Sequence, residues 1–140
     1  MNNRLLALAV VLMIVLSWPL AAAQGRLTDT FFKRIQLEPT PTGEMINARG
    51  RAAISINRHG IQSLRLQMVA DVPDGTTYAV LVRRQDKWFL IGTLQIRASF
   101  GQFAVYSADE PLPLGVDPVT DIEAIGVADG DRTFILFGEF

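Results

Sequence analysis

The sequence predicts an all-β domain after an N-terminal signal peptide. The expected architecture is an antiparallel β-sandwich of the immunoglobulin-like or Greek-key-like type. Three observations support this prediction. Short segments that are apolar, or that alternate between apolar and polar residues, recur along the chain, and Gly, Pro and Asp mark turns between them. No segment after the signal has a helical period. We therefore expect about seven to eight strands in one domain.

The first residues have the pattern of a secretory signal peptide. Arg4 precedes an uninterrupted apolar run, Leu5–Leu16, and Pro19 and three alanines follow it. A transmembrane anchor is the alternative, but a span needs about 20 apolar residues, and this run reaches that length only through a serine and a proline. We expect cleavage after Ala23. The predicted organisation is a signal peptide over residues 1–23, a flexible segment over 24–30 and a single β-sandwich domain over 31–140.

The first half of the domain contains three segments with strand patterns. Residues 31–38 alternate, and the two prolines within 39–43 end that strand. Apolar or small residues occupy the even positions of 46–56, the turn 57–60 follows, and 61–69 alternates again. The last two segments should pair as antiparallel strands with one dry face and one wet face. We expect buried side chains at Ile54, Ile56, Leu64, Leu66, Val80 and Leu94, and exposed ones at Ser55, Arg65 and Gln67.

Residues 76–96 give the strongest strand signal. Two apolar runs, rich in β-branched and aromatic residues, flank the charged segment 83–87 and predict a hairpin. Both runs are apolar on both faces near their centres, so we expect them in the middle of a sheet that other elements cover. The remaining segments predict a short strand, a Pro-rich crossover loop, an extended segment and a final strand, over residues 103–106, 107–118, 121–127 and 133–140.

Composition and charge argue against several classes of function. The chain has 13 basic and 14 acidic side chains, and its longest basic cluster is Arg83-Arg84 with Lys87, which we interpret as a solvated hairpin tip. Nucleic-acid binding needs clustered Lys and Arg, so no nucleic-acid partner is expected. There is no Cys, and the single histidine, His59, falls in a predicted turn. Zinc or copper sites of the usual ligand types, and a Ser/His/Asp site, are therefore not expected.

Acidic residues concentrate late in the sequence. They are Asp109, Glu110, Asp117, Asp121, Glu123, Asp129 and Asp131. Oxygen ligands at this density could bind calcium, or two of them could act as a glycosidase pair. The spacing around Asp129 does not match the calcium loop, no spacing selects a pair, and Asp is common in tight turns because it accepts hydrogen bonds from local backbone N–H groups. We interpret them as turn residues and predict no catalytic, metal-binding or cofactor-binding residue and no cofactor.

A set of aromatic residues could either line a carbohydrate platform or fill the core. These residues are Tyr78, Trp88, Phe89, Phe103, Tyr106, Phe134, Phe137 and Phe140. Aromatic residues on alternating strands usually belong to the core, which is the interpretation we favour. Trp88, next to the charged tip, is the one that we expect to be partly exposed.

The sequence from Leu66 onward also resembles a known type of module. A Pro/Asp-Gly turn leads into a Tyr-x-Val-x-Val strand, and the residues are Val72–Val82 and, after the tip, Ile91–Leu94. This pattern resembles the extracytoplasmic domain of anti-sigma-K factors, which are membrane proteins that regulate transcription. The resemblance implies a β-sandwich and a regulatory role. Only three residues precede Arg4, so we expect no cytoplasmic sigma-binding domain.

These observations predict an exported, periplasmic or extracellular, non-catalytic binding or assembly module of the cell envelope. The partner would be another envelope protein or a surface polymer, and membrane contact would come only through an uncleaved signal segment. The alternatives are a carboxylate-based glycan hydrolase and an extracytoplasmic sensory domain that joins through a strand edge. Several carboxylates in one concave pocket would favour the hydrolase, whereas an exposed apolar face or an open edge strand would favour assembly.

Overall fold

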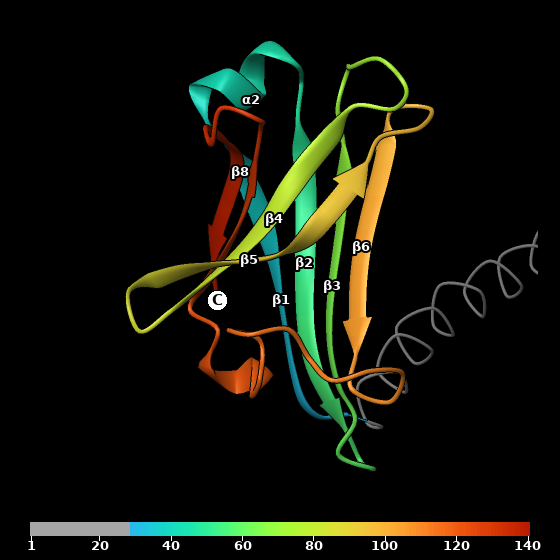
Figure 1. Ribbon diagram of the computed structural model, residues 1–140, viewed down its shortest axis with the longest axis vertical. Helices are drawn as coiled ribbons and strands as arrows, with labels where there is room; N and C mark the ends of the chain where they lie inside the picture. Colours follow the sequence, from blue (N-terminus) through green and yellow to red (C-terminus); the bar gives the residue numbers. More distant parts are fainter. Residues whose placement is uncertain (1–28) are drawn as a thin grey trace, which may run out of the picture.

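The computed structural model describes residues 29–140 and shows eight antiparallel strands (Figure 1). The predicted all-β class and the number of strands are confirmed. The strands are β1 (Asp29–Pro39), β2 (Arg49–Asn57), β3 (Gln62–Val69), β4 (Thr77–Arg84), β5 (Lys87–Gln95), β6 (Phe100–Tyr106), β7 (Ala124–Ala128) and β8 (Phe134–Glu139). Two short helices, α2 (Pro41–Met45) and the 3-10 helix η1 (Val119–Asp121), complete the fold.

The strands form one sheet that curls into two facing layers. Their order is β5-β4-β7-β8-β1-β2-β3-β6. We call β1, β2, β3 and β6 layer A, and β5, β4, β7 and β8 layer B. Only two residue pairs, Glu38 with Phe137 and Pro39 with Leu136, join the layers by strand pairing. In Figure 1 the long strands of layer A run nearly vertically, and β4 and β5 cross in front of them. The result is a sandwich that is nearly closed into a barrel.

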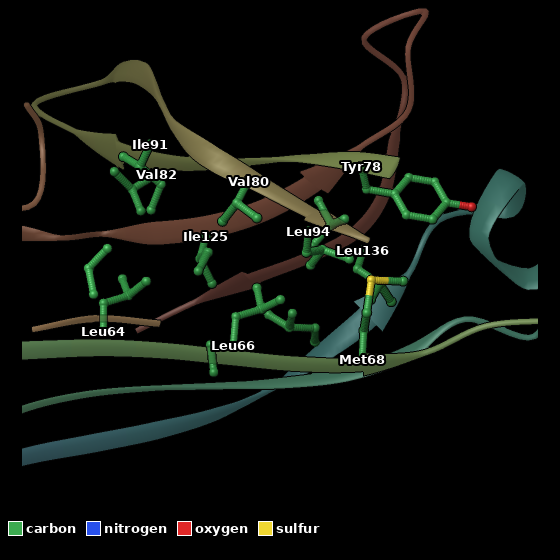
Figure 2. Close-up of a cluster of buried hydrophobic side chains, with 14 of the residues drawn as sticks. Leu64, Leu66, Met68, Tyr78, Val80, Val82, Ile91, Leu94, Ile125 and Leu136 are labelled. Atoms are coloured by element: carbon green, nitrogen blue, oxygen red, sulfur yellow. The ribbon is translucent and has the colours of Figure 1, made fainter. Parts of the chain in front are cut away.

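The hydrophobic core fills the space between the two layers (Figure 2). Leu64, Leu66 and Met68 rise from β3 and meet Val80 and Ile125 of layer B. Full burial of one such side chain stabilises a fold by about 1.5–3 kcal/mol, and no disulfide contributes because the chain has no Cys. Five of the predicted core residues are buried as expected, namely Ile54, Leu64, Leu66, Val80 and Leu94. Ile56 is half-buried against the core.

The prediction that Ser55 is exposed was wrong. Ser55 points away from the core, yet only 8% of it is exposed. It is paired in register with Ser63 on β3, and the two hydroxyl oxygens lie 2.7 Å apart in a buried hydrogen bond. A buried hydroxyl needs a hydrogen-bond partner. Here each serine hydroxyl bonds the other, whereas the sequence pattern suggested that Ser55 would bond to water. Arg65 is exposed as predicted, and Gln67 is partly buried.

The predicted hairpin of residues 76–96 is confirmed, and the predicted place in the middle of the sheet is correct for one of its two strands. β4 and β5 pair from Thr77 with Gln95 to Arg84 with Lys87. The two turn residues, Gln85 and Asp86, have φ of 50° and 60°, as two-residue hairpin turns require. β4 is a middle strand as predicted, because it pairs with both β5 and β7, whereas β5 stands at the end of the sheet order. The outer face of β5 includes Trp88, which lies against Phe134, and the exposed Leu90.

A helix occupies residues that the sequence placed in a turn and between that turn and the next strand. Thr40 caps α2, since its hydroxyl accepts a hydrogen bond from the N–H of Gly43 at 3.2 Å, and Pro41 begins the helix. The following strand therefore begins at Arg49 and not near residue 46. One turn of helix leaves no detectable period in the sequence, which explains the error.

The loop 107–118 crosses between the layers as predicted. It leaves β6 of layer A and reaches β7 of layer B through η1. Gly115 adopts φ of 92°, and a Cβ there would lie 2.7 Å from Cγ of Phe89 on β5. The loop thus packs tightly against β5, and its Val116 is completely buried.

The N-terminal predictions fall mostly outside the described residues. β1 begins at Asp29, so Asp29 and Thr30 belong to a strand and not to the predicted flexible segment 24–30. The signal peptide 1–23 and residues 24–28 lie outside the part that the structure describes. Within residues 29–140, no helix has the length and apolar character needed to cross a membrane.

Candidate functional site

The outer face of layer A carries a cluster of arginines. Strand register places Arg34, Ala53, Arg65 and Ala104 in one row across β1, β2, β3 and β6. The next row consists of Gln36, Arg51, Gln67 and Gln102. Side chains alternate along a strand, so both rows point away from the core. Arg49 lies two residues before Arg51 on β2 and therefore points to the same side. We call the two rows together with Arg49 the arginine face.

A hollow of about 200 Å³ lies over Ala53 at the centre of this face. Its lining includes the side chains of Arg34, Arg51, Arg65 and Phe32. Neighbouring strands are about 4.8 Å apart, so Arg34 and Arg65 start roughly 10 Å apart on either side of Ala53. The single methyl group of Ala53 leaves the space between them open.

Arg51 is held in place by a neutral neighbour. Its Nε and Nη2 atoms donate to Oε1 of Gln67, the residue opposite it on β3, at 3.0 and 2.8 Å. The bond orients the guanidinium without neutralising its charge. A second hollow, of about 300 Å³, continues from Arg51 past Arg49 towards Phe100. The arginine face therefore extends over two adjoining hollows.

The charges of this face are not compensated within the structure. Among residues 29–140, ion pairs involve Arg83 and Arg84 but none of the four arginines of the arginine face. The β1–β2 register, which ends with Leu37 opposite Gly50, brings Glu38 to the edge of the face near Arg49, but no ion pair joins these two side chains. Like charges on neighbouring strands repel and destabilise a sheet. Since the whole chain has a net charge of −1, positive charge is concentrated on one side.

Arg83 and Arg84 are not the solvated tip that the sequence suggested. Arg83 donates to Glu123 at 3.2 Å and to Glu139 at 3.0 Å, and Arg84 donates to Asp121 at 3.0 Å. The hydrogen bond to Glu139, followed by that to Glu123 and the two negative charges, raises the pKa of Arg83, although desolvation opposes the shift. These ion pairs fasten the β4–β5 hairpin to the elements that follow β6.

Two further late carboxylates, those of Asp117 and Asp129, accept hydrogen bonds within the fold. Asp117 accepts from Nε2 of Gln62 at 3.0 Å. Oδ1 of Asp129 accepts from the backbone N–H groups of Asp131 and Thr133, both at 3.0 Å, as expected of a turn aspartate. Within residues 29–140, no group of three or more His, Cys, Asp or Glu side chains is placed to hold a metal ion.

His59 lies in the β2–β3 turn, where the sequence placed it. It is exposed, and its Nε2 accepts from Nε of Arg58 at 3.3 Å. Gly60 follows with φ of 77°, the left-handed conformation predicted for this turn. No carboxylate orients the imidazole in this part of the described chain, so the geometry around His59 is that of a turn residue.

Three of the aromatic residues lie outside the core, on the outer face of layer B. The ring centroids of Trp88 and Phe134 are 4.9 Å apart, and those of Trp88 and Phe137 are 6.0 Å apart. Trp88 is partly exposed, as predicted, whereas the core assignment of Phe134 and Phe137 was wrong. Tyr78 is buried in the core, and Phe89, Phe103 and Phe140 pack against the core. Tyr106 is exposed, so its core assignment was also wrong.

The same outer face contains an apolar hollow of about 390 Å³. Trp88, Leu90 and Phe134 line it, and two charged residues, Asp129 and Arg132, take part. Leu90 is 66% exposed. An exposed apolar face, here on a strand at the end of the sheet order, is one of the two features expected to favour the assembly alternative.

The arginine face is not visible as a basic cluster in the sequence, because its residues are far apart along the chain and meet only through strand pairing. Its four arginines occupy positions 34, 49, 51 and 65, on three strands. The period-two pattern did assign Arg49, Arg51 and Arg65 to wet faces, and a comparison of the wet faces of successive strands would have revealed the cluster.

No family model, curated protein or solved structure matches this chain. The resemblance to the anti-sigma-K extracytoplasmic domain therefore stays a prediction.

Proposed function

We propose that this protein is an exported, non-catalytic binding module of the cell envelope that engages an anionic surface polymer through the arginine face. The observation that supports this most directly is the set of four arginines, without carboxylate partners among residues 29–140, on one exposed sheet face. The export part rests on the signal pattern of the first 23 residues.

The shape of the arginine face suits an extended polymer. Two shallow hollows adjoin along the direction of the strands, and the glutamines between them supply neutral donors and acceptors. Guanidinium groups bind carboxylate, sulfate and phosphate groups through paired N–H donors. Repulsion between Arg34, Arg51 and Arg65 lowers the stability of the sheet. A bound anionic partner would neutralise this repulsion and restore the lost stability.

A glycan hydrolase fits the described residues less well. Such an enzyme needs two carboxylates that flank one bond, yet neither hollow of the arginine face is lined by Asp or Glu. The apolar hollow contains one carboxylate, Asp129, and its Oδ1 already accepts two backbone hydrogen bonds. Binding is therefore the function that the geometry favours over hydrolysis.

Assembly of two copies through the edge of β5 is the second candidate. β5 has a neighbour on one side only, and Leu90 on it is exposed. Open edge strands are templates for pairing with another chain. Light scattering of the purified protein would give the mass of a dimer if this candidate is correct and of a monomer if it is not.

The polymer proposal is tested with probes of defined charge. Polyphosphate, heparin and polygalacturonate should bind the full exported protein in a salt-dependent way, and neutral dextran should not. A triple variant, Arg34→Gln, Arg51→Gln and Arg65→Gln, should lose most of the affinity. The control triple, Arg58→Gln, Arg97→Gln and Arg132→Gln, changes the net charge equally at exposed positions elsewhere and should retain it. Equal loss in both triples, or no binding to any charged probe at low salt, would overturn the proposal.

A further inference from the structure

We propose that the hollow over Ala53 is a discrete site for one phosphate group of the bound polymer, with Arg34, Arg51 and Arg65 as its ligands. This inference deepens the proposed function and rests on it, because it assigns a defined position to one anionic group on the arginine face. It also narrows the partner from any anionic polymer to one that carries phosphate.

The positions of the three arginines around Ala53 support a discrete site. Arg34 and Arg65 flank Ala53 in its row, on β1 and β3 respectively. Arg51 precedes Ala53 by two residues on β2 and therefore lies on the same face, about 7 Å along the strand. Side chains from three strands thus border one hollow, and Ala53 leaves it unfilled.

The number of donors favours phosphate over carboxylate. One guanidinium carries five N–H donors, and one arginine already satisfies a carboxylate by a bidentate pair. Three arginines around one hollow match a group with more acceptor oxygens and more charge. A phosphate monoester has three terminal oxygens and a charge of about −1.5 to −2 at neutral pH. A phosphodiester within a polymer has a single charge and would use the same donors.

Two neighbours prepare the hollow for such a group. The double hydrogen bond from Arg51 to Gln67 fixes the direction of the guanidinium, so less side-chain entropy is lost when an anion binds. Phe32, half-buried beside Arg34, supplies an apolar wall. Hydrogen bonds and ion pairs are stronger where apolar surface excludes water.

The decisive variant fills the hollow without changing any charge. Ala53→Leu should block the space between Arg34 and Arg65 and weaken binding of inorganic phosphate, pyrophosphate and polyphosphate by roughly tenfold or more, because charge-assisted hydrogen bonds are lost. Ala108→Leu is the matched control, since it makes the same change at an exposed position in the loop 107–118, outside the arginine face. It should change these affinities less than about twofold.

A second measurement needs no variant. Titration of the wild-type protein with pyrophosphate, followed by amide chemical shifts, should move the signals of Arg51, Ala53 and Arg65 in a saturable way and leave those of His59 unchanged. Gln67→Met frees Arg51 and should weaken pyrophosphate binding by less than Ala53→Leu does. Shifts spread over the surface, without saturation, would overturn the discrete site even if Ala53→Leu failed to fold.

The outcomes separate the two proposals. If Ala53→Leu binds polyphosphate normally while the Arg34/Arg51/Arg65 triple variant does not, the arginine face binds polymers but the discrete phosphate site is wrong. If no charged polymer binds, both proposals fail. Tighter binding to a single-stranded oligonucleotide, or to vesicles of phosphatidylglycerol, than to polyphosphate would show that the phosphate belongs to a nucleic acid or a lipid and would overturn the surface-polymer assignment.

Discussion

The outer faces of the two layers use the same residue type in opposite ways. On layer B, Arg83 contacts Glu123 and Glu139 and lies 5.8 Å from the ring centroid of Trp88. On layer A, Arg34 and Arg65 border a hollow without a carboxylate partner among residues 29–140. Paired arginines thus fasten elements of the fold, whereas arginines without a carboxylate partner on an exposed face are available to a ligand.

The arginines of layer B connect parts of the chain that are distant in sequence. Arg83 lies 40 residues before Glu123 and 56 before Glu139. Glu123 also accepts a hydrogen bond from the backbone N–H of Gln85 at 2.8 Å, in the hairpin turn itself. The projecting β4–β5 hairpin visible in Figure 1 is therefore tied to the segment around β7. On layer A the hydrogen-bonded ladders already hold neighbouring strands together, and the arginines are not needed for that purpose.

The largest expected effect comes from two adjacent residues of β3 that point to opposite faces. Leu66 is buried in the core and Arg65 is exposed on the arginine face. Leu66→Ala should lower the free energy of unfolding by about 2–5 kcal/mol, which is on the order of 10–20 °C in melting temperature. Arg65→Ala should hardly change it. Thermal unfolding followed by circular dichroism measures both, and equal losses would show that the assignment of β3 to these faces is wrong.

An effect of intermediate size distinguishes the two kinds of arginine. Arg83→Met should lower the melting temperature, since Glu123 and Glu139 lose their common partner. Arg65→Met should raise it slightly or leave it unchanged, because it removes a repulsive neighbour of Arg34 and Arg51. In 1 M salt the gain from Arg65→Met should disappear. A loss of stability with Arg65→Met as large as that with Arg83→Met would mean that the arginine face is a structural feature.

These contrasts also show where prediction from sequence succeeds. Period-two patterns located the strands and predicted the burial of Ile54 and Leu64, because successive side chains of a strand point to opposite faces of the sheet. The conformation of turn residues such as Gly60 could be predicted equally well, since it depends on a few neighbouring residues. Local sequence patterns are therefore sufficient to predict where the strands and turns lie and which strand faces point to the core.

Register and long-range pairing are not contained in any local pattern. The row of Arg34, Ala53 and Arg65 depends on which strands become neighbours and on their exact alignment. The buried hydroxyl pair of Ser55 has the same origin. A strand that is polar on one face indicates that those side chains point outwards. It does not indicate whether they contact water, a carboxylate or one another.

The smallest expected effect concerns Tyr78, which reports on the negative charge near layer B. Burial raises the pKa of Tyr78 above its ordinary value of 10.0, and the charge of Asp129 raises it further. The chain has two tyrosines, so Tyr106→Phe leaves Tyr78 as the only source of phenolate absorbance. The midpoint of that absorbance should lie above pH 10 in the folded protein. Asp129→Asn, which keeps the oxygen that accepts the turn hydrogen bonds, should lower the midpoint.

The same shift predicts a dependence of stability on pH. Below pH about 10 Tyr78 is protonated in both states, so the contribution of the neutral side chain is fully present. As the pH rises further, the unfolded chain loses this proton first, and the free energy of unfolding falls until the pH passes the raised pKa of folded Tyr78. Denaturant unfolding between pH 8 and pH 11 should therefore show a steeper decline for Tyr106→Phe, which keeps Tyr78, than for the double variant Tyr78→Phe, Tyr106→Phe. Parallel declines in the two variants would mean that Tyr78 ionises at the same pH in the folded and unfolded states, and that neither burial nor the charge of Asp129 raises its pKa.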